Sequence, residues 1–239
     1  SDVCSSDLVR GVLPSTEWKR NYYKKPEQKK WFGGETISLG IGQGYNAFTM
    51  VQLASATATI ASGGRKFAPR VVRATQDALT HAQVATTTSE PVDLGYAPEH
   101  IAVVRNGLVG VVTSGTSAQV FAGAGYQSAG KTGTAQAVTI GQKDKYNAAK
   151  LAEYQRDHAL YMAYAPADAP KIALAVVVEN AGFGAAAAAP IARRVFDYWL
   201  LGQYPSEEDI AATQKGQSGR PVGTPRSKKD VPLESSRLN

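Results

Sequence analysis

Residues 125–134 read Gly-Tyr-Gln-Ser-Ala-Gly-Lys-Thr-Gly-Thr, and the interpretation of the chain depends on whether this segment is a loop or a strand. Three short patterns match the segment at once. They are the phosphate-binding pattern Gly-x4-Gly-Lys-Thr over residues 125–132, the nucleophile pattern Ser128-x-x-Lys131, and a Lys-Thr-Gly-Thr tetrapeptide over residues 131–134. Each pattern works only in its own backbone context, so the local conformation has to decide among them.

The phosphate-binding pattern requires a helix directly after the glycine-rich loop, because the N–H groups hold phosphate at a helix N-terminus. Gly133 and Thr134 follow the loop here, with Val138 and Thr139 further on, and these poor helix formers favour a strand. A nucleotide-binding protein that uses Gly125 to Thr132 therefore ranks second among the possible functions. A non-catalytic interaction module ranks third.

A strand suits the Lys-Thr-Gly-Thr pattern. On a strand, Lys131 and Gly133 share one face, while Thr132 and Thr134 share the other. Gly133 leaves room for a substrate backbone to lie against the strand. Positions three apart on a strand point to opposite faces, so Ser128 is expected to be an ordinary polar residue at the strand entry.

The flanking sequence predicts an α+β fold, in which an antiparallel sheet is flanked by helices. Three segments rich in apolar and β-branched residues are expected to be strands: residues 131–140, 158–165 and 171–179. Three segments with helix signals are expected to be helices: residues 49–63, 98–115 and 191–202. The alanine run at residues 185–189 is expected to pack closely at the start of the last helix. Thr49 and Gln52 have capping-box spacing, and Pro98 suits a first helical position.

The remaining segments carry weaker signals. Residues 11–46 lack a sustained period and are expected to be a mostly irregular connection, while residues 66–95 are expected to form short strands and turns. Residues 1–8 resemble translated sequencing-adapter read-through, so we expect a foreign leader there. Residues 204–239 are rich in Ser, Gly, Pro and charge and are expected to be a disordered basic tail.

Composition limits the class of protein. The chain has 239 residues, of which 43% are hydrophobic, which is enough for one sizeable core. The net charge is +6, but residues 17–30 and 215–239 each carry +4, so the rest of the chain is close to neutral. The single cysteine, Cys4, excludes an intrachain disulfide framework. The apolar run at residues 172–178 is about a third of the ~20 residues that a membrane-spanning helix needs.

Two candidate binding features have simpler explanations. Residues 18–31 interleave aromatic and basic side chains, as single-strand binders do. The near-neutral body lacks the extended basic groove that binding along a phosphate backbone needs. Residues 18–31 are therefore expected to be a solvated loop, and no nucleic-acid partner is expected.

The three histidines give no sign of a metal site. His81, His100 and His158 are far apart in sequence and predict no metal site, and no cofactor is expected. For His158, beside Asp157, a hydrogen-bonded structural role is expected.

Five segments, taken in order, resemble a known family over residues 11–201. They are Gly-Val-Leu-Pro-Ser-Thr-Glu-Trp-Lys-Arg from Gly11, Trp-Phe-Gly-Gly-Glu-Thr-Ile-Ser-Leu-Gly-Ile-Gly-Gln-Gly-Tyr from Trp31, Lys-Thr-Gly-Thr-Ala-Gln from Lys131, Asp-His-Ala-Leu from Asp157, and Val-Glu-Asn-Ala-Gly-Phe-Gly from Val178. In this order and spacing they resemble class B penicillin-binding proteins of the penicillin-binding protein 2 type, the elongation-specific peptidoglycan transpeptidases.

The resemblance implies a partial serine β-lactamase/penicillin-binding transpeptidase fold and a serine acyl transfer in the periplasm. A Ser-x-x-Lys serine would attack the penultimate D-Ala carbonyl of a stem peptide ending in D-Ala-D-Ala, and a neighbouring stem's amine would resolve the acyl-enzyme. Lys131 would supply positive charge and a donor. Thr132 and Thr134 would help to fix the substrate carboxylate, and Gly133 would leave room. The N–H of Thr134 would form half of the oxyanion hole. β-Lactams would compete for the site.

The sequence departs from the family pattern at the nucleophile. It contains no credible Ser-x-x-Lys pair and no Ser-x-Asn, and in the family both lie upstream. We therefore expect residues 9–203 to be the C-terminal part of a transpeptidase domain, and the chain as it stands to be inert. The resemblance also implies a bacterial inner-membrane protein with its domain on the periplasmic face. Its expected partners are elongation-complex membrane proteins such as a glycosyltransferase.

Overall fold

A three-stranded antiparallel sheet in the order β5-β6-β7 forms the centre of the computed structural model, which describes residues 9–137, 151–217 and 219–231. The strands are β5 (Ala129–Ala135), β6 (His158–Ala165) and β7 (Ile172–Val178). Lys131 of β5 is paired with Met162 of β6, which is paired in turn with Ala175 of β7. The predicted strands and their antiparallel order are confirmed. The expected end of the first strand, residues 138–140, lies outside the described residues.

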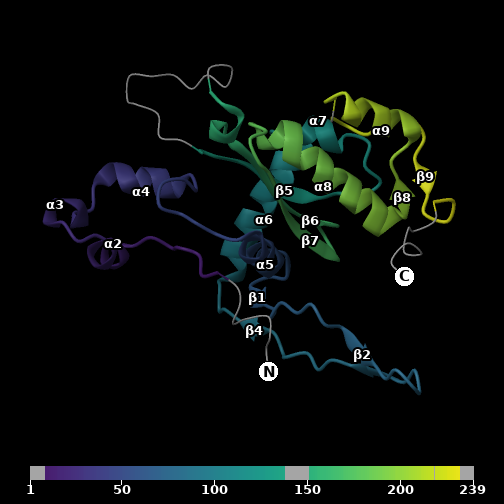
Figure 1. Ribbon diagram of the computed structural model, residues 1–239, viewed down its shortest axis with the longest axis horizontal. Coiled ribbons are helices and arrows are strands. Elements are labelled where there is room, and N and C mark those ends of the chain that lie inside the picture. Colours follow the sequence, from purple (N-terminus) through teal and green to yellow (C-terminus); the bar gives the residue numbers. More distant parts are fainter. Residues whose placement is uncertain (1–8, 138–150, 218, 232–239) are drawn as a thin grey trace.

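Helix α8 (Gly184–Leu201) covers one face of this sheet (Figure 1). Its Ala188, Ala189 and Phe196 are fully buried in one core cluster with Tyr161 of β6. The alanine run therefore serves close packing between the helix and the sheet. The run stands at the start of the helix, as expected, and the helix ends as expected before Gly202, which has a φ of 65°.

Helices α5 (Met50–Ala61) and α6 (Pro98–Thr113) lie on the opposite face of the sheet. Ala61 of α5 and Leu108 of α6 pack in one cluster with Tyr164 of β6. The expected capping of α5 is confirmed, since the Oγ1 of Thr49 accepts a hydrogen bond from the N–H of Gln52 at 3.2 Å. A short helix, α7 (Ala118–Phe121), lies between α6 and β5 in the chain.

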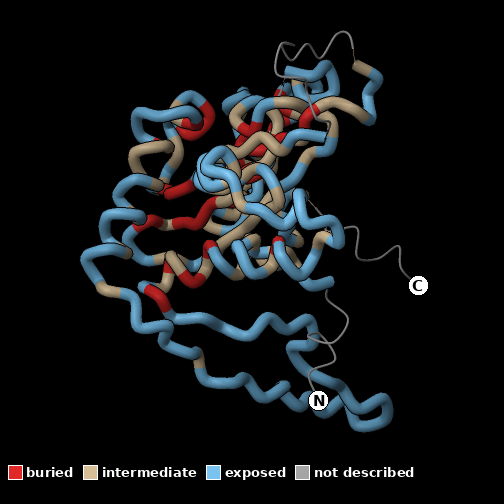
Figure 2. Tube along the Cα trace, turned by 90° about the vertical axis from the view of Figure 1, so that its left-hand side faces the viewer, coloured by how far each residue is buried: buried red, intermediate tan, exposed pale blue. Residues whose placement is uncertain are grey.

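The segment between α5 and α6 forms two small hairpin sheets, as expected for residues 66–95. Strand β1 (Arg65–Lys66) pairs with β4 (Val92–Asp93), and β2 (Ala74–Gln76) pairs with β3 (Gln83–Ala85). The part around β2 and β3 extends away from the body and is exposed along its length (Figure 2).

The expectation of an irregular connection over residues 11–46 is wrong. This segment contains α2 (Thr16–Tyr22), α3 (Pro26–Lys29) and α4 (Gly33–Gly40). Lys19 of α2 is only 2% exposed, and its Nζ donates to Glu35 and to the carbonyl of Lys30. Four aromatic rings surround the same ammonium group at 5.2 to 6.0 Å from their centroids: Tyr23, Trp31, Phe32 and Tyr45. These contacts join short helices that no sequence period reveals.

Acid is expected to loosen this three-helix segment through Glu35. Burial raises the pKa of Glu35, but hydrogen bonds from Lys19, Phe32 and Tyr45 outweigh burial and leave the pKa below its ordinary 4.5. The ionised carboxylate therefore adds stability that is fully present above pH 4.5 and is lost as the pH falls through the folded-state pKa. Tryptophan fluorescence followed from pH 7 downward should report this loss.

In the Glu35→Gln variant, this acid-induced fluorescence change should be absent. Glu17→Gln is the matched control because Glu17 is exposed on α2, and it should keep the wild-type titration. An unchanged titration in Glu35→Gln would contradict the assignment of the transition to Glu35.

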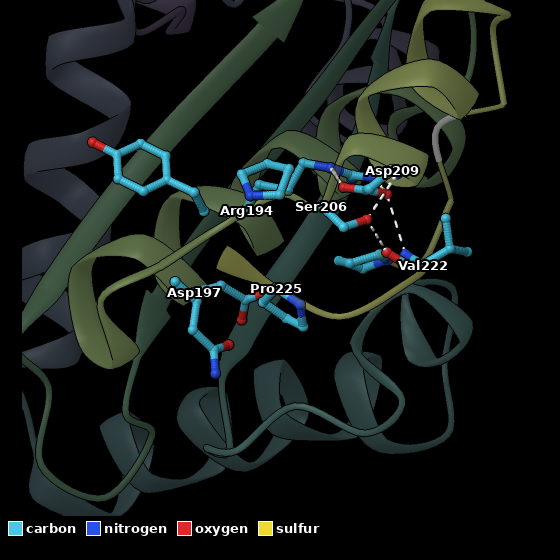
Figure 3. Close-up of a pocket in the computed structure, with 10 residues that line it drawn as sticks. Arg194, Asp197, Ser206, Asp209, Val222 and Pro225 are labelled. Atoms are coloured by element: carbon cyan, nitrogen blue, oxygen red, sulfur yellow. Dashed lines mark hydrogen bonds and ion pairs between the residues drawn. The ribbon is translucent and has the colours of Figure 1, made fainter. Parts of the chain in front are cut away.

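The described part of the expected disordered tail, residues 204–239, is ordered instead. It contains β8 (Gln203–Tyr204), α9 (Glu207–Gln214) and β9 (Arg226–Ser227). Asp209, 1% exposed, accepts hydrogen bonds from Arg194 of α8 at 2.6 and 2.8 Å and from the N–H of Val222 at 3.2 Å (Figure 3). Ser206 caps α9 and donates to the carbonyl of Val222. The prediction of disorder was wrong because it used only the composition of the tail, which cannot reveal the ion pair between Asp209 and Arg194. The expected leader, residues 1–8, lies outside the described residues.

The Asp209→Ala variant is expected to release the C-terminal segment from α8. The variant loses the buried ion pair with Arg194, and hydration of the freed Arg194 limits the local cost to about 2 kcal/mol. Limited trypsin proteolysis should then cleave after Lys215 at least tenfold faster, at an unchanged melting temperature of the sheet.

The matched control for this variant is Glu207→Ala. Glu207 pairs with Arg226, but its side chain is 76% exposed, and such pairs contribute little. Equal cleavage rates in the two variants would contradict the role of the Arg194–Asp209 pair.

Candidate active site

Strand β5 lies at the edge of the sheet and carries all the predicted site residues. Within the described residues it pairs with β6 alone, so its other edge carries no strand. The phosphate-binding interpretation of residues 125–132 is wrong, because Lys131 and Thr132 lie in this strand and not at the start of a helix. The fold instead provides an open strand edge, and strand edges of this kind can receive an extended peptide.

The two faces of β5 carry the residue pairs that the sequence predicted. Thr132 is opposite Tyr161, whose ring is buried with α8, and Thr132 and Thr134 lie on that face. Lys131 and Gly133 lie on the other face, toward α5 and α6. The Oγ1 of Thr132 is 3.0 Å from the Oγ1 of Thr116. Thr116 was not predicted as a partner of Thr132, because no motif in the sequence around it indicates this contact.

Lys131 is exposed, and its ammonium group is available to an anion. Its Nζ donates to the carbonyl of Thr132 at 2.6 Å, and no ion pair among the described residues involves it. A cation with three donors beside an open strand edge can hold a carboxylate or support a proton-transfer network.

The backbone of Thr134 faces the open edge. The Nε2 of Gln43, which belongs to no strand of this sheet, donates to the carbonyl of Thr134 at 3.4 Å, and we infer that this carbonyl points away from β6. In an antiparallel strand the N–H and C=O of one residue point to the same side, so the N–H of Thr134 also faces this edge. The Gly-Gln-Gly part of the family-like segment after Trp31 was the sequence signal for Gln43, although no role was predicted for it.

A buried ion pair fixes the loop that leads into β5. Arg193 and Asp197 of α8 are paired at 2.9 Å, and the hydroxyl of Tyr126 donates to Asp197 at 2.9 Å. Burial and the charge of Asp197 raise the pKa of Tyr126, so its hydroxyl keeps its proton and remains a donor. These contacts attach the loop before β5 to helix α8.

Ser128 and His158, which match patterns of catalytic residues, have structural roles. Ser128 is fully buried directly before β5, as expected for a polar residue at the strand entry. The Nδ1 of His158 accepts the N–H of Asn180 at 2.9 Å, which agrees with a structural role. Within the part of the chain that the structure describes, no three His, Cys, Asp or Glu side chains are grouped as metal ligands. No helix in that part is long and apolar enough to cross a membrane.

Known proteins match most of this chain. The family model of the penicillin binding protein transpeptidase domain matches residues 19–197. The chain belongs to this family. The transpeptidase domain is 37% identical to peptidoglycan D,D-transpeptidase MrdA of Haemophilus influenzae, covering 95% of this chain and 33% of that protein. It is 42% identical to MrdA of Acinetobacter baumannii, covering 80% of this chain and 27% of that protein.

A solved structure extends the likeness to the fold. The crystal structure of Pseudomonas aeruginosa PBP2 in complex with WCK 5153 gives a TM-score of 0.63 at 36% identity, over 80% of this chain and 38% of that one. The predicted family and the α+β fold are confirmed, and the comparisons give no support to a nucleotide-binding protein or an interaction module. The chain spans about a third of the length of the curated relatives it matches.

Proposed function

We propose that the chain is part of a serine-type peptidoglycan D,D-transpeptidase that cross-links stem peptides during cell elongation. The observation that carries the proposal is the Lys-Thr-Gly-Thr sequence on the open edge of β5, in a domain of the transpeptidase family. The substrates would be stem peptides ending in D-Ala-D-Ala, and β-lactams would bind in their place. The reaction needs no metal or cofactor, because acyl transfer to serine uses only protein groups.

In this proposal the strand binds the substrate and stabilises the acyl-transfer transition state. Lys131 supplies positive charge and a donor to the hydrogen-bond network of the site, and the side chains of Thr132 and Thr134 help to hold the terminal carboxylate through charge-assisted hydrogen bonds. Gly133 gives the peptide backbone room to approach the strand. The N–H of Thr134 on the open edge donates to the oxyanion as the carbonyl becomes tetrahedral. A serine nucleophile from a Ser-x-x-Lys motif outside this sequence would complete the site.

The whole protein is proposed to act at the periplasmic face of the bacterial inner membrane, held by an anchor outside this sequence. Its partners would be other membrane proteins of the elongation complex, including a glycosyltransferase that supplies the glycan strands. The relatives named peptidoglycan D,D-transpeptidase support this setting.

The first test is acylation by benzylpenicillin, read by intact-mass spectrometry. The 239-residue chain should gain no mass. A chimera that joins residues 9–239 to the preceding part of the Acinetobacter baumannii relative should gain one penicilloyl group. A folded chimera that stays unmodified, or an adduct on the chain alone, would contradict the proposal.

The Lys131→Ala variant of the chimera is expected to acylate about tenfold more slowly, the effect of losing one charge-assisted hydrogen bond. Lys171→Ala is the matched control, because Lys171 is equally exposed next to β7 at the far side of the sheet. Equal acylation rates in the two variants would remove Lys131 from the site.

A further inference from the structure

Helices α2 and α3 and the turn between them carry exposed cations and a stacked ring pair. We define the cation-aromatic face by four exposed basic side chains and this ring pair: Lys24, Lys25, Lys29, Lys30, Trp18 and Tyr22. No ion pair among the described residues involves any of these cations. Their charge is therefore available to an external anion, unlike that of the buried Lys19, which Glu35 neutralises.

The ring pair adds a flat apolar surface beside these charges. The rings of Trp18 and Tyr22 are stacked at 4.9 Å with 21° between their planes, and Tyr22 is 65% exposed. Tyr45 supports Trp18 from the interior, at 5.3 Å between centroids. The pair is thus held in place by packing on one side and open on the other. Sugar rings, whose C–H groups are attracted to the negative faces of aromatic rings, pack on surfaces of this kind.

The cation-aromatic face is connected to the candidate active site. Glu35 of α4 bonds both Lys19 and Tyr45, and Gln43, just beyond α4, bonds the carbonyl of Thr134 on the open edge of β5. In Figure 1 the helices α2, α3 and α4 lie together to one side of the sheet, and the chain after α4 returns to it. A polymer whose peptide lies on the β5 edge could therefore continue along this face.

We propose that the cation-aromatic face is an accessory site for the glycan-peptide polymer. Lysines there would hold stem-peptide carboxylates while the Trp18–Tyr22 pair packs against sugar rings. The inference rests on the proposed function, because that function places a stem peptide on β5. An anionic membrane could use the same cations, but the link through Gln43 to Thr134 and the flat ring pair favour a polymer that carries both peptide and sugar.

The test measures retention of the full chain on purified Gram-negative peptidoglycan sacculi at several salt concentrations. The triple variant Lys24→Gln, Lys25→Gln, Lys29→Gln is expected to bind about tenfold more weakly at low salt. The control triple Lys215→Gln, Arg220→Gln, Lys229→Gln removes the same charge from exposed positions of the C-terminal segment and should bind as wild type. Tyr22→Ser changes no charge and should weaken binding even at high salt. Circular dichroism checks that each variant is folded.

Four results would overturn the proposal. Absence of wild-type retention, or equal losses in both triple variants, would show that this face has no specific role. Equal or tighter binding to phosphatidylglycerol-containing vesicles, with the same loss in the Lys24/Lys25/Lys29 variant, would identify a membrane surface instead. Full retention of the Lys24/Lys25/Lys29 variant together with loss of retention in Lys131→Ala would place the binding at β5, which would support the proposed function and exclude this one. Retention needs no nucleophile, so it is independent of the acylation test.

Discussion

The Gly184→Ala variant is expected to lower the free energy of unfolding by about 3 kcal/mol. Gly184 is the first residue of α8 and is buried against the sheet. A Cβ atom there would overlap the carbonyl oxygen of Leu160 and lie 2.7 Å from that of Gly133. Both oxygens belong to the backbone of paired strands, so they cannot rotate away, and the helix would have to lift off the sheet. Urea denaturation of the purified chain measures this loss.

The control is Gly107→Ala, in the middle of α6. No atom lies within 4 Å of a Cβ added at Gly107, so alanine fits without strain. Alanine also has the higher helix propensity, and we expect a gain of about 0.5 to 1 kcal/mol. Similar stabilities for the two variants would mean that α8 does not approach β5 and β6 as closely as the structure places it.

The close approach of Gly184 explains how α8 supports the candidate active site. The helix contacts the backbone of β5 at Gly133, one residue before Thr134, and holds the loop before β5 through the Arg193–Asp197 pair. Both ends of the strand segment are therefore tied to one rigid helix. A preorganised donor needs this rigidity, because misplacement of the N–H of Thr134 would weaken its bond to an oxyanion.

The sheet and its site were predictable because their signals are local. Apolar runs define β6 and β7, and the Lys-Thr-Gly-Thr sequence disfavours a helix, so the strand face of each site residue follows from alternation. The Thr49 cap and Pro98 likewise mark helix starts through contacts within one turn.

The elements that were missed depend on contacts between distant residues. The folded arrangement of residues 11–46 depends on the ion pair between Lys19 and Glu35. Helix α9 is held in place by the ion pair between Asp209 and Arg194. Helices of four to eight residues carry too few positions to show a period, and their short length makes them marginal without tertiary contacts. The side-chain bond from Gln43 to Thr134 spans 91 residues and has no pattern that could predict it.

The Thr134→Pro variant of the chimera is expected to acylate with benzylpenicillin on the order of 100-fold more slowly, or slower still. Proline lacks the N–H that we assign to the oxyanion hole. Proline is tolerated at a sheet edge where the N–H faces away from the neighbouring strand, and the Gln43 contact puts the backbone of Thr134 in that position. The loss should therefore appear in the acylation rate, with a melting temperature only a few degrees lower.

Thr134→Val separates the backbone donor from the side chain. Valine keeps the N–H and the β-branched shape but removes the hydroxyl, so it should cost about tenfold at most, through weaker binding of the carboxylate. Stopped-flow acylation over a range of benzylpenicillin concentrations distinguishes the two effects. The proline variant should mainly lower the maximal rate, because the oxyanion is absent from the ground-state complex and forms only as the carbonyl becomes tetrahedral, whereas the valine variant should mainly raise the half-saturating concentration. If both variants acylate equally fast, the N–H of Thr134 is not an oxyanion donor, and the open edge of β5 serves only to bind the peptide.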